Sequence, residues 1–214
     1  RADGKGEVDL KVPPETGRGA IAPVQYRDHR SVLLKGTGMN PEHVGINNKI
    51  RYNVNANEPA VFFDGMFRLR QGMFDIMNSE LLNSIGVSTA KPLGLIGIGK
   101  DPNTGHEIGI YAREFLVQTR LSNLQALPLK EARKELDAAI ENLFSLKITE
   151  KRLDYVEYFF WLTETLARQT ARMQASGFEH GVLHSQQFTL AGEITDLATG
   201  RWIDGLGARA WGVE

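Results

Sequence analysis

The strongest candidates for chemistry lie in the run from His180 to Phe188, which is followed by Asp196. An aspartate placed after a polar loop and a short hairpin suits a magnesium ion that also binds phosphates, because magnesium prefers hard oxygen ligands. The pair His180 and His184 could instead indicate a metal site. That spacing suits a metal only on a helix, and Gly181 between them argues against a helix. We therefore expect an oxygen-based site centred on Asp196.

A second candidate is Lys35, which ends the apolar segment Ser31–Lys35 and is followed at once by Gly36-Thr37-Gly38. A lysine in this position can bury its stem and project its ammonium into a cleft. Gly36 and Gly38 would then permit close approach of a phosphate. The alternative is a lysine that simply ends its strand in solvent, and the local residues leave both readings open.

Two acidic and two basic residues extend this set. Asp75 and Glu80 lie on the next predicted helix, and either carboxylate could hold Lys35 in place. Arg113 and Arg120 follow, and arginine is the side chain best suited to grip phosphate oxygens with two parallel hydrogen bonds. Each of these four residues could equally be solvated, since helices and loops routinely display charges outwards.

The elements that must position these residues can be predicted from apolar periodicity and turn residues. We expect a strand at 31–35, a helix over 64–85 that stops at Gly86, and a β-hairpin over 93–115. The chain after residue 120 is strongly helical. This order predicts an α+β fold of one domain with two lobes: a small β-rich N-lobe with one long helix over 1–120, and a mostly helical C-lobe over 121–214.

Each predicted helix also has an expected apolar face. In the helix over 64–85 the face comprises Met66, Leu69, Met73, Met77, Leu81 and Leu82. In the first helix of the C-lobe it comprises Leu136, Ile140, Leu143 and Leu146. In the next helix it comprises Leu153, Val156, Phe159, Phe160, Thr163 and Leu166. Beyond these helices we expect a small hairpin that turns at Ala191-Gly192.

Composition narrows the function classes. The 214 residues are 42% hydrophobic and 24% charged, which is ordinary for a globular domain. A net charge of -1 gives no support for broad electrostatic binding to nucleic acid or to a membrane surface. The absence of cysteine excludes disulfides and thiolate metal sites and fits a reducing compartment. We therefore expect a cytoplasmic protein with neither a nucleic-acid nor a membrane partner.

Taken together, the motifs resemble the selenoprotein O family. Leu34–Pro41 resembles that family's Leu-Lys-Gly-Ala-Gly-x-Thr-Pro segment, and Asp64-Gly65 opening a helix resembles its Asp-Gly-Arg helix. Gly86–Leu93 resembles its Gly-Ile-Pro-Thr-Thr-Arg-Ala-Leu, and His180–Leu183 resembles its His-Gly-Val-Met. Arg113 and Arg120 keep the separation of its two phosphate-contacting arginines, and Asp196 falls where its metal-binding aspartate should be.

The resemblance implies a bilobal protein-kinase-like fold that binds ATP in a flipped orientation and transfers AMP to protein hydroxyls. It implies ATP and magnesium as ligands and a protein or peptide as substrate. It also implies a role for each site residue: phosphate contacts for Lys35, Gly36, Gly38, Arg113 and Arg120, orientation of Lys35 by Asp75 or Glu80, and magnesium binding by Gln187 and Asp196.

The catalytic loop departs from the family pattern. The family has Asn-Thr-Asp-Asn after His-Gly-Val-Met, and this chain has His184-Ser185-Gln186-Gln187. Gln186 thus stands at a catalytic position where the family has an acid, and glutamine cannot act as a general base near neutral pH. Gln187 replaces a metal-ligating asparagine. His184 or His180 could substitute as the base. The alternative function is a catalytically degenerate pseudokinase that serves as a nucleotide-binding scaffold or regulator.

Overall fold

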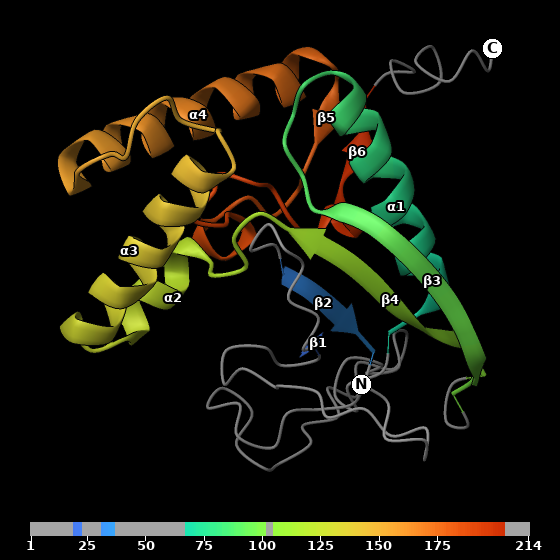
Figure 1. Ribbon diagram of the computed structural model, residues 1–214. Coiled ribbons are helices and arrows are strands. Elements are labelled where there is room, and N and C mark those ends of the chain that lie inside the picture. The colour runs from blue at the N-terminus through green and yellow to red at the C-terminus, as the bar shows by residue number, and fades with distance from the viewer. Residues whose placement is uncertain (1–18, 23–30, 37–66, 102–104, 204–214) are drawn as a thin grey trace. The chain divides into compact units, whose positions relative to one another are not determined.

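The computed structural model describes residues 19–22, 31–36, 67–101 and 105–203. They form an α+β protein whose strands and helices are drawn in Figure 1. In chain order the elements are β1 (Gly19–Ala22), β2 (Ser31–Lys35), α1 (Leu69–Ser84), β3 (Lys91–Lys100), β4 (Glu107–Phe115), α2 (Leu121–Ala126), α3 (Leu129–Ser145), α4 (Tyr155–Ala175), β5 (Phe178–Glu179), η1 (Ser185–Gln187), η2 (Leu197–Thr199) and β6 (Arg201–Trp202). The chain divides into two compact units.

The first unit contains the four-stranded sheet, in the order β1-β2-β4-β3. β1 and β2 are antiparallel, with Gly19 opposite Lys35. Val32 and Leu33 are buried, and Lys35 at the end of β2 is half-buried. Gly36 follows with a positive φ of 90°, and a Cβ placed on it would lie 2.3 Å from the carbonyl oxygen of Gly109. A glycine is therefore needed here, because no side chain fits between β2 and β4.

The predicted hairpin over 93–115 is confirmed as β3 and β4. Its connection begins with a hydrogen bond from the Asp101 N–H to the His106 carbonyl, 2.9 Å long. A second bond joins the Gly105 N–H to the Asp101 carbonyl at 2.8 Å, and Gly105 has a φ of 69° that favours glycine. The described ends of the connection are thus closed by two backbone hydrogen bonds.

Helix α1 begins at Leu69, and its predicted start at Asp64 lies outside the described residues. Phe67 and Arg68 are not helical, because the Gly109 N–H donates to the Phe67 carbonyl and Arg68 forms a bridge with Ile108. The predicted stop at Gly86 is confirmed. Gly86 has a φ of 80°, and the next N–H reaches back to the Leu82 carbonyl at 2.9 Å.

The predicted apolar face of α1 is wrong at Met73 and Met77, which are exposed, and confirmed at Leu82, which is buried. Leu69 and Leu81 are half-buried, and Met66 lies outside the described residues. The other buried residues of the helix from residue 75 onward are polar: Asp75, Asn78 and Ser79. Asp75 and Asn78 bond to the backbone of Leu197 rather than packing on an apolar layer, which is why hydrophobic periodicity could not find them.

The second unit has a core between α3 and α4, and Ala139, Ile140 and Leu143 are its buried residues on α3 (Figure 1). The predicted face of α3 is therefore confirmed at Ile140 and Leu143. On α4 the predicted face is wrong at four of its members, since Val156, Phe159, Phe160 and Thr163 are exposed. Its members Leu153 and Leu166 are half-buried against the core, and the fully buried set is Tyr158, Leu162, Gln169 and Met173. The start of α4 is apolar or aromatic on several sides, so periodicity alone could not select the buried stripe.

A second cluster of buried residues joins the end of α1 to the segment that follows α4. Its members are Leu82, Val87, Met173, Phe178, Ile194 and Leu197. Strands β5 and β6 pair antiparallel beside it, with Phe178 opposite Trp202 and their rings edge to face at 5.0 Å. None of the helices in the described ranges has the length and apolar character needed to cross a membrane.

Candidate functional site

The site is built on a tight hairpin in the second unit. Phe188 and Ile194 form an antiparallel bridge, the Thr189 N–H donates to the Glu193 carbonyl, and the turn contains Gly192 with a φ of 75°. The predicted turn at Ala191-Gly192 is therefore confirmed. The preceding residues Gly181–Leu183 form a bend and no strand.

Helix α4 holds this hairpin at its turn. The Tyr158 hydroxyl donates to the Leu190 carbonyl at 2.7 Å, and Gln169 donates through Nε2 to the Gly192 carbonyl at 2.9 Å. Burial raises the pKa of Tyr158 above its usual range, because the ionised phenolate would lose its hydration. The turn is thus anchored by two buried polar side chains, so the hairpin can present its open end as a rigid element.

Arg120 is brought to the hairpin by its own backbone. The Leu121 N–H donates to the Phe188 carbonyl at 2.9 Å, and the Leu190 N–H donates to the Thr119 carbonyl at 2.8 Å. Arg120 also precedes α2, where its N–H donates to the Asn123 side chain at 3.0 Å. The backbone of Arg120, which carries the guanidinium, is therefore fixed against the same hairpin.

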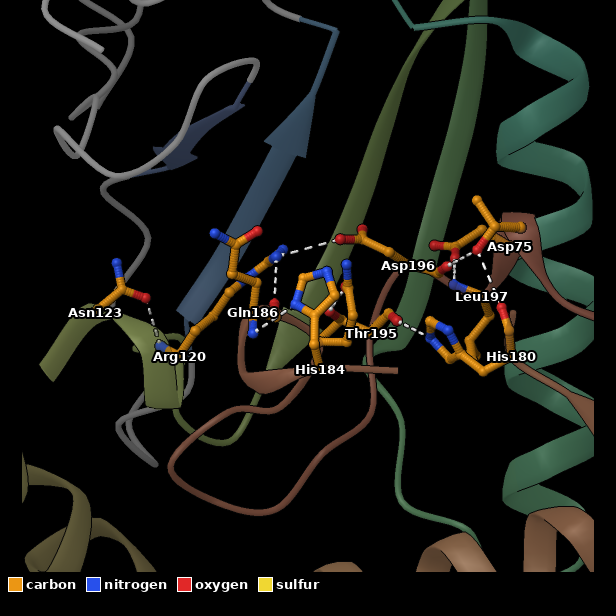
Figure 2. Close-up of polar contacts among 11 residues, drawn as sticks. Asp75, Arg120, Asn123, His180, His184, Gln186, Thr195, Asp196 and Leu197 are labelled. Carbon is orange, nitrogen blue, oxygen red and sulfur yellow. Dashed lines mark hydrogen bonds and ion pairs between the residues drawn. The ribbon is translucent and has the colours of Figure 1, made fainter. Parts of the chain in front are cut away.

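The Arg120 guanidinium binds two groups at once (Figure 2). Its Nη1 donates to the Gln186 carbonyl oxygen at 2.6 Å and to Oδ2 of Asp196 at 3.2 Å. The Arg120 and Asp196 side chains are 25% and 24% exposed. Both charges are thus partly shielded from water yet reachable by a ligand, which strengthens their interaction relative to a fully solvated pair.

Asp196 has an unusual backbone conformation. Its φ is 58° and its ψ is 46°, the left-handed region that side chains other than glycine, asparagine and aspartate rarely adopt. Holding such a residue there costs about 1–3 kcal/mol, and residues of this kind cluster at functional sites. The ion pair of Asp196 with Arg120 is consistent with that pattern.

The two histidines of the loop have different environments. His180 is buried, and its Nε2 donates to the Thr195 carbonyl oxygen at 2.7 Å, since a carbonyl can only accept. His184 is exposed and accepts the Gln186 N–H through Nδ1 at 3.2 Å. His180 therefore holds the backbone before Asp196, and only His184 faces solvent.

Asp75 lies at the other side of the same segment. Its Oδ1 accepts the N–H of Leu197, the residue after Asp196, at 2.8 Å, as Figure 2 shows. Glu80, the other acidic candidate on α1, is exposed. Of the two, Asp75 is therefore the residue that is built into the site around Asp196.

The remaining phosphate candidates belong to the first unit. The Lys35 ammonium lies 5.6 Å from the centre of the Phe67 ring, a cation–π contact. Arg113 is 1% exposed, and its guanidinium lies 5.9 Å from the centre of the Tyr111 ring. Gly36 is placed by the close approach of β4, and Gly38 lies outside the described residues.

The donor set can be tested against magnesium. Asp196 offers a partly exposed carboxylate, and Gln187 offers an amide oxygen that already accepts the Thr195 hydroxyl at 3.1 Å. Within the described ranges, no three acidic or histidine side chains gather as a metal cage. Magnesium commonly binds through one or two carboxylates plus phosphates and water. These residues therefore fit an ion that takes most of its ligands from a nucleotide.

Residues outside the predicted set also shape the site. Glu193 is buried, and its carboxylate accepts the Leu116 N–H at 3.0 Å and the Thr189 hydroxyl at 3.1 Å. It thereby joins the hairpin to the segment that leads to Arg120. The four-residue interval between Thr189 and Glu193 was visible in the sequence, but nothing there indicated that the carboxylate would be buried.

The described residues are thus an α+β protein with a charged site on a short hairpin. The family model for protein adenylyltransferase SelO matches residues 60–204. This match covers most of the chain, and the chain belongs to that family. The resemblance seen in the motifs is therefore confirmed.

Individual relatives agree. The chain is 28% identical over 150 residues to the protein nucleotidyltransferase YdiU of Synechococcus elongatus, covering 66% of this chain and 30% of that protein. It is 28% identical over 149 residues to the protein of the same name from Aeromonas salmonicida, covering 67% and 30%. The Rhodopirellula baltica protein is 25% identical over 197 residues, covering 82% and 33%. The chain thus spans about a third or less of the length of these relatives.

Proposed function

We propose that this chain carries the nucleotide site of a protein adenylyltransferase, which binds ATP with magnesium and transfers AMP to a hydroxyl of a protein or peptide. The observation that carries the proposal is the contact of Arg120 with both the Gln186 carbonyl and Asp196, at 2.6 and 3.2 Å. Family membership supports the same reaction. The proposed fold is the bilobal kinase-like one.

The charges at this hairpin suit the ligands. Arginine can bind phosphate oxygens, and an aspartate carboxylate can bind magnesium. In the structure the two side chains neutralise each other. A nucleotide with its magnesium would supply a new anion for Arg120 and a new cation for Asp196, so both charges would stay paired. Magnesium, when bound, would neutralise phosphate charge that develops in the reaction.

The proposed transfer balances as a single displacement. The hydroxyl oxygen of the substrate forms a bond to the α-phosphorus of ATP. The bond from that phosphorus to the oxygen that bridges to the β-phosphate breaks, and pyrophosphate leaves with the electron pair. The hydroxyl proton goes to a base or to solvent. Under this proposal Arg120 stabilises phosphate charge, and Asp196 with Gln187 holds the metal.

The proposal also assigns phosphate contacts to Lys35, Gly36, Gly38 and Arg113. For the carboxylate on α1 that would orient Lys35, the proposal prefers Asp75 to Glu80. Asp75 is buried and bonded within the site, whereas Glu80 is exposed. Transfer of the γ-phosphate in place of AMP would use the same charges and is the variant reaction that the labelling experiment below separates.

A second function is favoured by one observation. Gln186 stands where the family has an acid, and its carbonyl, not its side chain, is the group that contacts Arg120. Glutamine cannot accept a proton near neutral pH. The chain could therefore bind ATP without transferring it and act as a nucleotide-bound scaffold or regulator.

The test is a calorimetric titration of ATP with and without magnesium. Wild type is compared with Asp196→Asn, Arg120→Gln and Lys35→Ala, with Arg152→Gln as a matched control because Arg152 forms exposed ion pairs elsewhere. We expect magnesium to tighten binding to wild type and to the control. Asp196→Asn should lose that magnesium effect, and Arg120→Gln should weaken binding in both conditions. Equal ATP affinity in all five proteins would refute the assignment.

Labelled ATP then separates the two functions. Label on a protein from α-labelled but not γ-labelled ATP indicates AMP transfer, and the reverse indicates phosphate transfer. Binding with no label from either ATP identifies the scaffold function.

A further inference from the structure

Asn78 has both ends of its side-chain amide bonded inside the second unit. Nδ2 donates to the Leu197 carbonyl oxygen at 2.9 Å, and Oδ1 accepts the indole N–H of Trp202 at 3.1 Å. A carbonyl can only accept and an indole N–H can only donate, so the orientation of the amide is unambiguous. The residue is buried, at 6% exposure.

Asp75 lies one helical turn before Asn78 and therefore on the same face of α1. Its Oδ1 accepts the N–H of Leu197 at 2.8 Å. Together, Asp75 and Asn78 bind both backbone polar groups of Leu197, whose side chain is 1% exposed in the cluster with Leu82 and Ile194. Leu197 is thus held by its backbone and by its side chain.

This double contact sits immediately after the strained residue. Asp196 has a φ of 58°, and its preceding neighbour Thr195 is held through its carbonyl by His180 at 2.7 Å (Figure 2). The direction in which a side chain leaves the backbone follows from the backbone conformation of its own residue. With both neighbours held, the backbone at Asp196 cannot relax to an ordinary conformation without breaking buried hydrogen bonds. The partners of its neighbours therefore set where the Asp196 side chain starts, and the bond to Arg120 holds its carboxylate.

We infer that Asn78 is a positioning residue for Asp196: with Asp75, it holds the Leu197 peptide so that the Asp196 carboxylate stays beside Arg120 and can serve a nucleotide-bound magnesium. The inference rests on the proposed function for its role in nucleotide binding. Magnesium demands nearly ideal octahedral geometry, so a small displacement of one carboxylate matters more for the metal than for the nucleotide alone. A residue that acts only through packing would affect both equally.

The primary test measures ATP affinity with and without magnesium in Asn78→Leu, which is similar in size but cannot form either bond. Trp202→Phe is the matched control, because it removes the other partner of Asn78 and leaves the bond to Leu197 possible. We expect the magnesium effect on affinity to fall about fivefold or more in Asn78→Leu. A fivefold change corresponds to the loss of one hydrogen bond, here the bond to the Leu197 carbonyl. Affinity without magnesium should change less than about twofold, and Trp202→Phe should retain the magnesium effect.

Several results would overturn the inference. Asn78→Leu could keep the full magnesium effect, could lose affinity equally with and without magnesium, or could match Trp202→Phe. If Asn78→Leu does not fold, as judged by thermal melting, Asn78→Ala replaces it, because alanine favours a helix and adds no volume. The same expectations apply to that variant.

Amide hydrogen exchange keeps this test independent of the proposed function. If wild type binds no ATP, the proposed function fails, and the contact is then judged by exchange at residues 196–199. We expect exchange there to be about fivefold faster in the Asn78 variant than in wild type, with exchange in α3 unchanged. Equal exchange at 196–199, or an equal rise in α3, would overturn the positioning role whether or not nucleotide binds.

Discussion

The contact between Arg120 and Asp196 makes a quantitative prediction that does not require a ligand. The two groups lie 3.2 Å apart, with the side chains about a quarter exposed. At an effective dielectric constant of about 20 the attraction of two unit charges at that distance is about 5 kcal/mol. Desolvation, side-chain ordering and salt offset most of this, and charged hydrogen bonds of this kind contribute about 1.5–3 kcal/mol net. We expect a coupling free energy of about 1–2 kcal/mol.

The perturbation is a double-mutant cycle of Arg120→Gln and Asp196→Asn. Asparagine is chosen because it tolerates the left-handed conformation of Asp196, so strain at that residue changes little between the variants. Arg120 also donates to the Gln186 carbonyl, and that bond is lost in the Arg120→Gln variant and in the double variant alike. It therefore cancels in the coupling, as does any other contact that only one of the two residues makes.

The assay is urea denaturation of the four proteins at low and moderate salt, followed through the tryptophans. The coupling should be positive and should decrease as salt rises, because the pair is partly exposed. A coupling within about 0.3 kcal/mol of zero at low salt, which is within the usual error of additivity, would show that the two charges do not stabilise each other. ATP and magnesium would then not be taking over the two partners of a stabilising ion pair, and this support for nucleotide binding at Arg120 and Asp196 would be lost.

Three further changes test the fold around the site. Tyr158→Phe should cost about 1 kcal/mol of unfolding free energy at neutral pH through the lost hydrogen bond. Because burial raises the pKa of Tyr158, the stability of wild type should fall above about pH 10, and the difference in unfolding free energy between wild type and variant should narrow there. Urea denaturation at pH 8 and above measures this difference, and a difference that stays constant would contradict the effect of burial on Tyr158. Gly200→Ala should destabilise the protein by about 1–3 kcal/mol, because its Cβ would lie 2.1 Å from Cζ of Phe178. Gly94→Ala, whose Cβ would meet nothing within 4 Å, should be near neutral, and thermal melting of both variants measures the contrast. Asp154→Ala should lower stability by about 1 kcal/mol, because Asp154 caps α4 by accepting an N–H at 2.8 Å, and an unchanged melting temperature would show that this cap contributes little.

Local patterns in the sequence predicted the elements that depend on neighbouring residues. The strand at Ser31–Lys35, the hairpin of β3 and β4 and the helix stop at Gly86 all follow from short-range rules of turn and capping geometry. The small hairpin with its turn at Gly192 follows from the same rules. Family membership was equally visible, because motifs in the right order are a property of the chain itself.

Burial was harder to predict, and the errors have a physical cause. Hydrophobic periodicity assumes that a buried face is apolar. On α1 the buried residues include Asp75 and Asn78, because these two side chains bind the peptide groups of the distant residue Leu197. On α4 the aromatic residues near the start cover more than one side, and the partner helix decides which side is buried.

The sequence by itself determined which residue types could handle a nucleotide: the arginine at 120, the aspartate at 196 and the departure at 186. Only the tertiary structure decided which of them meet. The bonds that bring Arg120 to Asp196, and Asn78 to the peptide beside it, join residues 76 and 119 positions apart in the chain. No local rule specifies such contacts, because they form only when the hairpin, α1 and the segment before α2 pack together, and their geometry is set by that packing.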